Sequence, residues 1–436
     1  MRSTGKTLTP EQEALSQARK LKKLEAQSAP VKAKKSIELY KRNWVETEQS
    51  TTPSVPVLTF RLMTWNMLAQ TLVRRDLFPT SDCLRGNQRI GMLIQELMNS
   101  AADVICLQEV DRLEVLLPEL HAAGYSHIYA SGRNKKHGCM VLYRESQFKK
   151  IHEETIYYDE ETARLDTSGT SQPIGNSFRT KNIGLIVALQ SVHSNLGLVV
   201  ATTHLFWHPR YTYERARQVS ILLRNVYRFR NELNQPDWPS YIAGDFNLPP
   251  NDAVYTLLAG KPLSELQKQS IMKSSVVHAS VDPSVSSSGA PADDEEGGED
   301  PDRVITNARS AVPEDGLLTC LELPKIYEPF VPVRSAYEVG LRGSIQSSQS
   351  VFGKRLEGMD IRDLGYFEPM FTSYTYYWQA TLDYIFIADP PNFETRVTKV
   401  LEPIATEVLE GGLPRSGICA SDHVSLIADL ALVPSD

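Results

Sequence analysis

Polar side chains adjoin apolar, strand-like runs at five places in this 436-residue chain, and their types suit chemistry at a metal ion. Four groups follow such a run and the fifth precedes one: Asn66, Gln108-Glu109, His204, Asp245-Phe246-Asn247 and Ser421-Asp422-His423. Open α/β folds place their sites at the carboxyl ends of strands, so we expect these side chains to meet. They supply the hard oxygen ligands that Mg²⁺ prefers and the donors that hold a phosphodiester.

Each of these residues also has an ordinary structural explanation when it is considered alone. An Asn such as Asn66 commonly forms a turn, and an acidic residue such as Glu109 can occupy the first turn of the next helix. His204 alone would more often be a hydrogen-bonded core histidine. Asp245 and Asn247 are two residues apart on an extended segment and so point to one side, where one can take a proton from water while the other orients it. The combination favours a catalytic site.

Apolar periodicity predicts a strand-rich α/β core that positions these residues. A strand over 61–66, an amphipathic helix over 89–97 and a strand over 103–107 form a strand–helix–strand unit. The other predicted elements are strands over 138–143, 183–189, 198–203, 240–243, 382–388 and 424–432, and a long helix over 213–233. Twenty-six prolines and eighteen tyrosines also favour such a core over a helical bundle.

Two polar stretches fall outside the predicted core. The first 50 residues hold eleven Lys or Arg against six Glu, so we expect 1–54 to be a basic, mostly disordered tail with one helix start at Thr9-Pro10. Residues 274–313 are rich in Ser, Pro, Gly and Asp and cannot bury enough apolar surface to offset their ordering entropy, which predicts a disordered acidic insertion. The catalytic domain is therefore expected over 55–436.

Charge and composition limit the classes of protein to which this chain can belong. The net charge of −7 owes much to the acidic tract at 293–302, so the sum does not exclude a nucleic-acid partner for the folded body. No run of about 18 uncharged apolar residues is present, and the five cysteines form no C-x-x-C pair. We expect an intracellular protein of the cytoplasm, the nucleus or both, monomeric and without a membrane partner.

Six motifs, taken in order, resemble the endonuclease/exonuclease/phosphatase superfamily. They are Thr64-Trp65-Asn66, Leu107-Gln108-Glu109, Thr203-His204, Gly244-Asp245-Phe246-Asn247, Leu382-Asp383-Tyr384-Ile385-Phe386 and Ser421-Asp422-His423. Further segments are similar to the deadenylase, nocturnin and Angel branch, and most to fungal Ngl-type RNA exonucleases: 65–69, His137-Gly138-Cys139, Asn182-Ile183-Gly184, 204–209 and Tyr374-Thr375. The resemblance implies a DNase I-like, two-layer αββα sandwich. It also implies a 3′-to-5′ exoribonuclease, dependent on Mg²⁺ with Mn²⁺ as an alternative, that degrades single-stranded RNA, including poly(A), to 5′-nucleoside monophosphates.

The resemblance assigns roles in metal binding and in activation of the attacking water to individual residues of this chain. It implies that Glu109 is the primary Mg²⁺ ligand, that Asn66 lies beside it, and that Asp422 lies near a second metal if one binds. Asp245 would activate the attacking water, and Asn247 would orient that water or stabilise the oxyanion.

Phosphate contacts carry over in the same way. His204 would donate to the scissile phosphate. His423 would hold a phosphate oxygen and would itself be held by Asp383, as in the His–Asp pair of the family.

Base recognition is expected to depend on stacking, since the bases of a single strand expose their faces. Trp378 matches an aromatic residue that stacks a terminal base in deadenylases, and Pro209 matches a proline near the same pocket. Asn182 and Trp207 are further candidates for substrate binding, although Trp207, like Tyr211, has local packing as its alternative.

Two departures from the branch leave the adenine preference open. His137-Gly138-Cys139 stands where the branch usually has Asp-Gly-Cys, and Trp378-Gln379-Ala380 where it usually has Phe-Lys-Gly. One alternative function is a nocturnin-like phosphatase acting on a small phosphorylated dinucleotide. That branch carries basic residues soon after the motif histidine, whereas Arg210 is the only charged residue close behind His204 here. An alternative of another class is an inactive RNA-binding adaptor.

Overall fold

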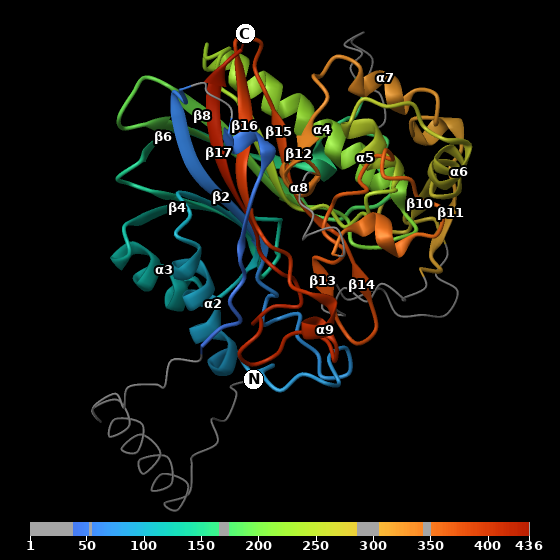
Figure 1. Cartoon of the computed structure of the whole chain (residues 1–436). Helices are drawn as coiled ribbons and strands as arrows, with labels where there is room; N and C mark the ends of the chain where they lie inside the picture. Colours follow the sequence, from blue (N-terminus) through green and yellow to red (C-terminus); the bar gives the residue numbers. More distant parts are fainter. Residues whose placement is uncertain (1–37, 52–54, 165–173, 286–304, 343–349, 436) are drawn as a thin grey trace, which may run out of the picture. The chain divides into compact units, whose positions relative to one another are not determined.

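Two β-sheets lie face to face, and helices cover their outer faces (Figure 1). The computed structural model describes residues 38–51, 55–164, 174–285, 305–342 and 350–435. The first sheet has seven strands, in the spatial order β1 (Trp44–Glu46), β16 (Phe393–Leu401), β17 (Leu426–Pro434), β2 (Leu58–Asn66), β3 (Val104–Val110), β5 (Gly138–Arg144) and β4 (Tyr125–Ser131). The second has six: β12 (Arg334–Ser335), β15 (Asp383–Ala388), β9 (Ser240–Asp245), β8 (Gly197–His204), β7 (Ile183–Ser191) and β6 (Phe148–Tyr157).

Alternation along the strands decides which side chains fill the space between the sheets. On β3, Val104 and Cys106 belong to the central cluster, whereas Ile105 and Leu107 face the helices outside. This period of two is what a strand that is buried on both faces requires. The four-layer arrangement therefore agrees with the αββα sandwich expected from the sequence.

Helices complete the outer layers. The first sheet is covered by α2 (Gly86–Ser100) and α3 (Leu113–Ala122), whose apolar residues join one cluster with β2 and β3. The second sheet is covered by α4 (Thr212–Glu232), with α5 (Ala253–Leu258), α6 (Glu265–Lys273) and α7 (Leu323–Tyr327) packed around it. The remaining short elements are α8 (Ala336–Leu341), α9 (Thr406–Leu409), β10 (Val276–His278), β11 (Ala308–Ser310), β13 (Ser373–Tyr374), β14 (Gln379–Ala380) and the 3-10 turns η1 (Glu48–Thr51), η2 (Tyr158–Glu160), η4 (Pro313–Asp315) and η6 (Phe352–Arg355).

The predicted end of the N-terminal tail needs correction. β1 pairs antiparallel with β16, and the side chain of Arg42 donates to the carbonyl of Ser425 (2.8 Å) and forms an ion pair with Glu96 (2.8 Å). Residues 39–51 therefore belong to the folded domain. Nothing in the sequence indicated this, because the average composition of a long segment does not reveal three paired residues and one half-buried ion pair. Residues 1–37 and 52–54, including the predicted helix start at Thr9-Pro10, lie outside the described residues.

The predicted insertion over 274–313 is also too wide. Its two flanks pair as β10 and β11, with Val277 buried between them and the domain. Arg309 joins the flanks through ion pairs to Asp282 (2.8 Å) and Asp315 (2.7 Å). Residues 286–304 lie outside the described residues.

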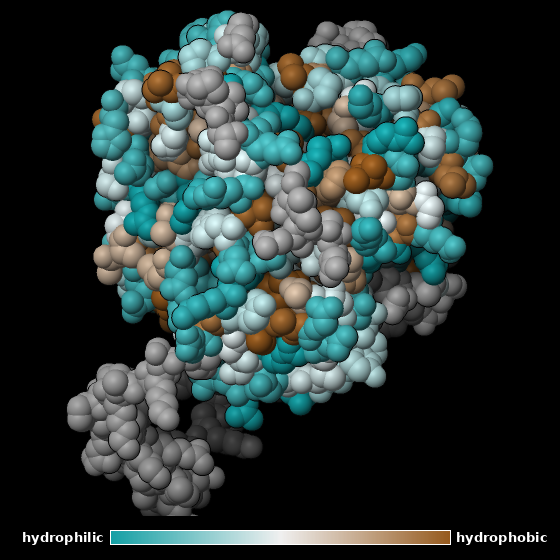
Figure 2. Space-filling model, viewed as in Figure 1, coloured by the Kyte–Doolittle hydropathy of each residue, from teal (hydrophilic) through white to brown (hydrophobic). Residues whose placement is uncertain are grey.

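The surface seen in Figure 2 is mostly hydrophilic, and its exposed apolar side chains form small separate groups. Such scattered apolar residues are normal on a folded domain. Among the described helices, none combines the length and apolar character that a membrane crossing requires.

Candidate active site

Three polar residues of the second sheet form one row across neighbouring strands. His204, the last residue of β8, is paired with Asp245, the last residue of β9, and Asp245 is paired with Asp383, the first residue of β15. Since β8 and β9 are parallel and β15 runs the opposite way, all three side chains reach the same edge of the sheet. We refer to them as the catalytic row, after the role proposed for them below.

Glu109 reaches this edge from the first sheet through an irregularity in β3. The register between β3 and β5 shifts between Leu107 and Val110, and Glu109 adopts a left-handed backbone with φ of +55°. Such a bulge redirects a side chain, and a non-glycine residue in this region costs about 1–3 kcal/mol, a strain that concentrates at functional sites. The carboxylate of Glu109 is held by the backbone N–H of Ala69 (2.8 Å).

Asn66 joins the two sheets at this point. Its amide Nδ2 donates both to Glu109 Oε1 (2.9 Å) and to Asp245 Oδ2 (3.0 Å), while its Oδ1 accepts from the N–H of Leu68 (3.0 Å). The ring of His204 lies between the same two carboxylates, with Nδ1 3.9 Å from Glu109 and Nε2 3.6 Å from Asp245. Residues from four strands therefore surround one small polar space, which we call the polar centre.

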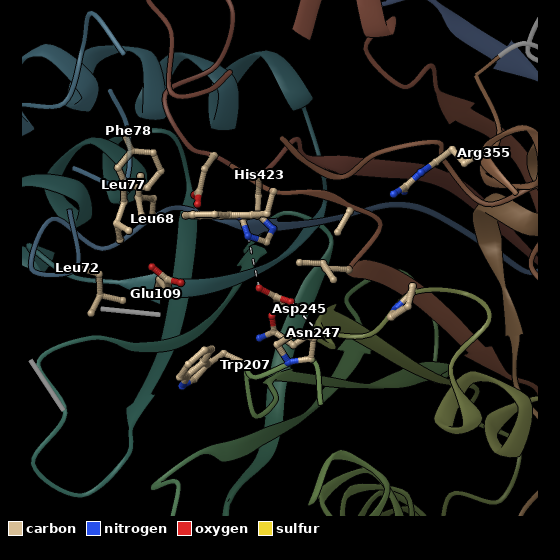
Figure 3. A pocket seen from close by; sticks show the side chains of 16 residues that line it. Leu68, Leu72, Leu77, Phe78, Glu109, Trp207, Asp245, Asn247, Arg355 and His423 are labelled. Carbon is tan, nitrogen blue, oxygen red and sulfur yellow. Dashed lines mark hydrogen bonds and ion pairs between the residues drawn. The ribbon is translucent and has the colours of Figure 1, made fainter. Parts of the chain in front are cut away.

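His423 enters the polar centre from the loop before β17. Its Nδ1 is 2.8 Å from Asp383 Oδ2, and its Nε2 is 3.7 Å from Asp245 Oδ2, the contact drawn as a dashed line in Figure 3. Burial lowers the pKa of His423, but the carboxylates of Asp383 and Asp245 more than offset that effect and hold the pKa well above its usual value. The imidazole is therefore a cation held between two carboxylates.

The loop that carries His423 is itself anchored to β2. Ser421 Oγ donates to the carbonyl of Asn66 (2.7 Å) and accepts from the N–H of His423 (3.1 Å). The indole N–H of Trp65 donates to the carbonyl of His423 (2.7 Å). The predicted motif residues 64–66 and 421–423 therefore contact one another directly.

The donor set of the polar centre fits a divalent cation. Glu109, Asp245 and Asp422 are at most 6 % exposed, and burial raises the pKa of Asp422. Several carboxylates that share a desolvated space repel one another unless a cation or a proton neutralises them. Glu109, with Asn66 and Asp422 nearby, would hold the ion, which would polarise a phosphoryl oxygen and neutralise developing charge.

A second grouping of possible metal ligands overlaps this one. Donor atoms of Asp245, Asp383 and His423 all lie within 4.8 Å of one another. His423 Nδ1 and Asp383 already engage one another, however, whereas the carboxylate of Glu109 is oriented by Ala69 and Asn66. We therefore assign the ion to the side of Glu109.

A cavity of about 340 Å³ opens beside the polar centre. Glu109, Asp245, Asn247, Asp422 and His423 lie along its polar side, as Figure 3 shows for four of them. Its apolar walls include the three predicted base-binding residues Trp207, Pro209 and Trp378. Trp378 meets Phe78 edge to face with ring centroids 6.0 Å apart. We call this space the aromatic cavity.

Two sequence-based candidates lie elsewhere. Asn182 does not line the aromatic cavity; it lines a smaller groove next to Glu109 and His204. Tyr211 packs against Phe178 and His208, with ring centroids 4.7 Å apart in each case. For Tyr211, the alternative of local packing is therefore the one that the structure favours.

The structure adds residues that the sequence analysis missed. One wall of the aromatic cavity is formed by Leu68, Leu72, Leu77 and Phe78, and its far end by Arg355 (Figure 3). The Arg355 guanidinium is held by the carbonyls of Met370 (2.8 Å) and Gln379 (2.9 Å). The four apolar wall residues belong to an irregular loop and Arg355 ends the short 3-10 turn η6, so no periodicity in the sequence marks them.

Arg89 was missed although the sequence contains a signal for it. Its side chain is fully buried and donates to the carbonyls of Ala420 (2.6 Å) and Leu68 (2.6 Å), which ties the loop after β2 to the loop before β17. Arg89 shares the helix face of Leu93 and Leu97, and a charged residue on an apolar helix face is unusual.

Comparisons with known proteins agree with this architecture. Residues 63–423 match the model of the Endonuclease/Exonuclease/phosphatase family. A probable RNA exonuclease of Schizosaccharomyces pombe is 31 % identical over 411 residues, which cover 89 % of this chain and 78 % of the relative. RNA exonuclease NGL2 of Saccharomyces cerevisiae is 30 % identical, with 86 % and 78 % covered. The crystal structure of ANGEL2, a 2′,3′-cyclic phosphatase, in complex with adenosine-2′,3′-vanadate shares the fold, with a TM-score of 0.57, 20 % identity and 91 % and 99 % covered.

The family match spans most of the chain, and the catalytic row, Glu109 and His423 lie inside the matched residues. The chain is therefore an enzyme of the Endonuclease/Exonuclease/phosphatase family, a nuclease or phosphodiesterase.

Proposed function

We propose that this enzyme is a Mg²⁺-dependent exoribonuclease that shortens single-stranded RNA from its 3′ end and releases 5′-nucleoside monophosphates. The observation that carries the proposal is the aromatic cavity, which opens directly onto the polar centre and is large enough for one nucleoside. A terminal base between Trp378 and the opposite apolar wall would place the phosphate that precedes it beside Glu109 and Asp245. The names of the two fungal relatives support RNA as the substrate.

The residues of the polar centre suit in-line hydrolysis. Asp245 accepts hydrogen bonds from the amide of Asn66 (3.0 Å) and the N–H of Asn247 (2.9 Å), which fix its carboxylate as the base that takes a proton from water. The water oxygen attacks phosphorus and the bond from phosphorus to the 3′ oxygen breaks. The released nucleotide keeps the 5′ phosphate, and the leaving 3′ oxygen takes a proton from solvent, so that the shortened strand ends in a 3′ hydroxyl.

The two histidines stabilise the charge that builds up on the phosphate oxygens. His423 is cationic and is aimed by Asp383, so its Nε2–H can donate to a phosphate oxygen throughout the reaction. His204 lies on the opposite side of Asp245, where it can reach a second oxygen. Glu109 and Asn66 would hold the Mg²⁺ ion that supplies the Lewis acid.

A time course on labelled strands tests the proposal. The substrates are 5′-labelled oligo(A), an RNA of mixed sequence and its DNA equivalent, each with Mg²⁺ or with EDTA, for the wild type and for Glu109→Ala. We expect a Mg²⁺-dependent ladder that shortens from the 3′ end and that the variant lacks; comparison of the two RNAs then measures the preference for adenine. An intact strand in every lane of the wild type would refute the proposal. Release of inorganic phosphate from a phosphorylated dinucleotide would then support the phosphatase alternative. RNA binding without any cleavage would support the alternative of an inactive adaptor.

A further inference from the structure

A narrow groove meets the polar centre beyond the His204 end of the catalytic row. The polar and charged side chains that line it are Glu109, Lys135, His137, Lys181, Asn182 and His204. The aromatic cavity lies toward Asp245 and His423, and the two spaces share Glu109. The groove and the cavity therefore approach the same carboxylate from different sides.

Backbone contacts hold the two loops of the groove together. Gly132 packs so tightly that a Cβ atom there would lie 1.9 Å from the carbonyl oxygen of Lys181. The N–H of Lys135 donates to the carbonyl of Gly132 (3.0 Å), and its ammonium Nζ donates to Asn182 Oδ1 (2.6 Å). The half-buried ammonium group is thus placed by both loops.

The loop that carries Lys181 is fixed from behind. Asp159 accepts from the N–H of Thr180 (3.1 Å) and from that of Lys181 (2.8 Å), and Gln218 of α4 donates to Thr180 Oγ1 (3.0 Å). Lys181 adopts a left-handed backbone with φ of +54°. A non-glycine residue is held in this conformation only where its surroundings determine it, so the loop is organised before any ligand arrives.

The chemistry of the groove suits a phosphodiester backbone. Its walls carry two lysines and two histidines, and Glu109 is the only acidic residue among them, although the chain as a whole has a net charge of −7. It is shallow and narrow, with a volume of about 20 Å³, which suits a phosphate oxygen better than a base. The groove would therefore contact the strand without reading its sequence.

We infer that this groove binds the RNA phosphate one nucleotide to the 5′ side of the scissile phosphate. This inference rests on the proposed function, which puts the 3′-terminal nucleoside in the aromatic cavity and the scissile phosphate at the polar centre. The rest of the strand must then leave past Glu109, and the groove is the cationic path on that side. Lys135 and Lys181 bind the upstream phosphate, and Asn182 keeps the ammonium of Lys135 in position.

Two dinucleotides isolate this contact. ApA contains the scissile phosphate alone, whereas pApA adds one phosphate at the 5′ position that the groove would take. We expect kcat/KM of the wild type for pApA to exceed that for ApA by about tenfold or more, the size of a charge-assisted hydrogen bond. Lys135→Ala and Lys181→Ala should bring the ratio close to one, because each removes a contact to the added phosphate, and Lys135→Arg should restore part of it.

Lys136→Ala is the matched control. It removes the same charge from the neighbouring residue of the same loop, which is exposed and does not line the groove, so it should keep the wild-type ratio. A wild-type ratio near one, or an unchanged ratio in both groove variants, would overturn the inference while leaving the proposed function standing. If the wild type hydrolysed neither dinucleotide nor longer RNA, the proposed function would fail, and this inference with it.

Binding in EDTA gives a readout that does not depend on catalysis. The affinity for a fluorescent RNA of about ten nucleotides is measured by anisotropy over a range of salt concentrations. The quantity compared is the slope of log affinity against log salt concentration. We expect this slope to be smaller than that of the wild type by about one phosphate contact in Lys135→Ala and in Lys181→Ala, and to equal that of the wild type in Lys136→Ala. Equal slopes in all four proteins would contradict the inference.

Discussion

The polar centre and the aromatic cavity share a wall, yet they are built in different ways. The side chains of the polar centre stand at the ends of paired strands, and hydrogen bonds tie them across the two sheets, as Asn66 ties Glu109 to Asp245. The aromatic cavity is formed by loops between strands and helices, including residues 68–78 and 207–209. Strand register leaves the reacting groups little freedom, whereas loops can change without disturbing the sheets. We therefore expect the polar centre to govern kcat and the aromatic cavity to govern KM and base preference.

The largest expected effect comes from removing the charge of Glu109. Glu109→Gln keeps the size of the side chain but loses the anionic ligand of the metal, so kcat should fall on the order of 10³-fold or more. RNA affinity in EDTA should remain within a few-fold of the wild type. Glu114→Gln, an exposed acid on α3, should leave kcat unchanged. A steady-state assay with saturating RNA checks this, and an active Glu109→Gln enzyme would contradict the assignment of the metal ligand.

Asp383→Asn should have the second largest effect. The amide keeps a hydrogen bond to His423 but removes one of the two carboxylates that hold its pKa above the usual value, so less of the imidazole is cationic. We expect kcat to fall about 100-fold at neutral pH. Because the missing charge raises the fraction of neutral imidazole, activity should recover partly as the pH falls. A pH profile of kcat, with melting temperature as the check on folding, distinguishes this role from a structural one.

Trp378→Ala tests the aromatic cavity. Loss of one base-stacking surface should cost about 1–3 kcal/mol of binding, or roughly 5- to 150-fold in KM, with a smaller change in kcat. Trp378→Phe should recover much of the affinity. Tyr376→Ala is the control, because Tyr376 lies in the same β13–β14 turn, is 57 % exposed and does not line the cavity. A drop in kcat with unchanged KM would contradict the division between the two regions.

Glu368→Gln should change stability rather than catalysis. Burial and the charge of Glu338 raise the pKa of Glu368 from 4.5 to about 8, while the hydroxyl of Tyr255 donates to it (2.7 Å). The folded protein therefore keeps a proton that the unfolded chain has already released between these two pH values. The contribution of Glu368 to the free energy of unfolding is therefore fully present below pH 4.5. It is lost as the pH rises toward 8, by up to about 1.4 kcal/mol per pH unit.

Denaturant unfolding between pH 5 and 8 measures this contribution. The neutral amide of Glu368→Gln should reduce the fall in unfolding free energy with rising pH, while kcat for RNA stays near that of the wild type. Glu368 lies in the segment whose Met370 carbonyl holds Arg355 at the far end of the aromatic cavity, so KM is the quantity to monitor for a secondary effect. An identical pH dependence in both proteins would contradict the raised pKa.

Much of the fold followed from local sequence patterns. The strand predicted over 103–107 corresponds to β3, the helix over 213–233 to α4, and the strand over 424–432 to β17, shifted by two residues. β6 was not identified, because half of its residues are exposed and it shows no apolar alternation. The walls of the aromatic cavity from Leu72 to Phe78 were missed for a related reason: a loop has no period from which burial can be predicted.

The sequence by itself determined which residue types stand at the strand ends, because alternation of apolar and polar residues is a local property. Only the tertiary structure decided which of these residues meet. β9 lies between β8 and β15, so Asp245 is paired with His204 on one side and with Asp383, 138 positions later, on the other. That strand order depends on burying both faces of each sheet at once, and therefore on contacts between residues that are far apart in the sequence. The bulge that turns Glu109 toward Asn66, and the loops that bring Lys135 to Asn182, were decided in the same way.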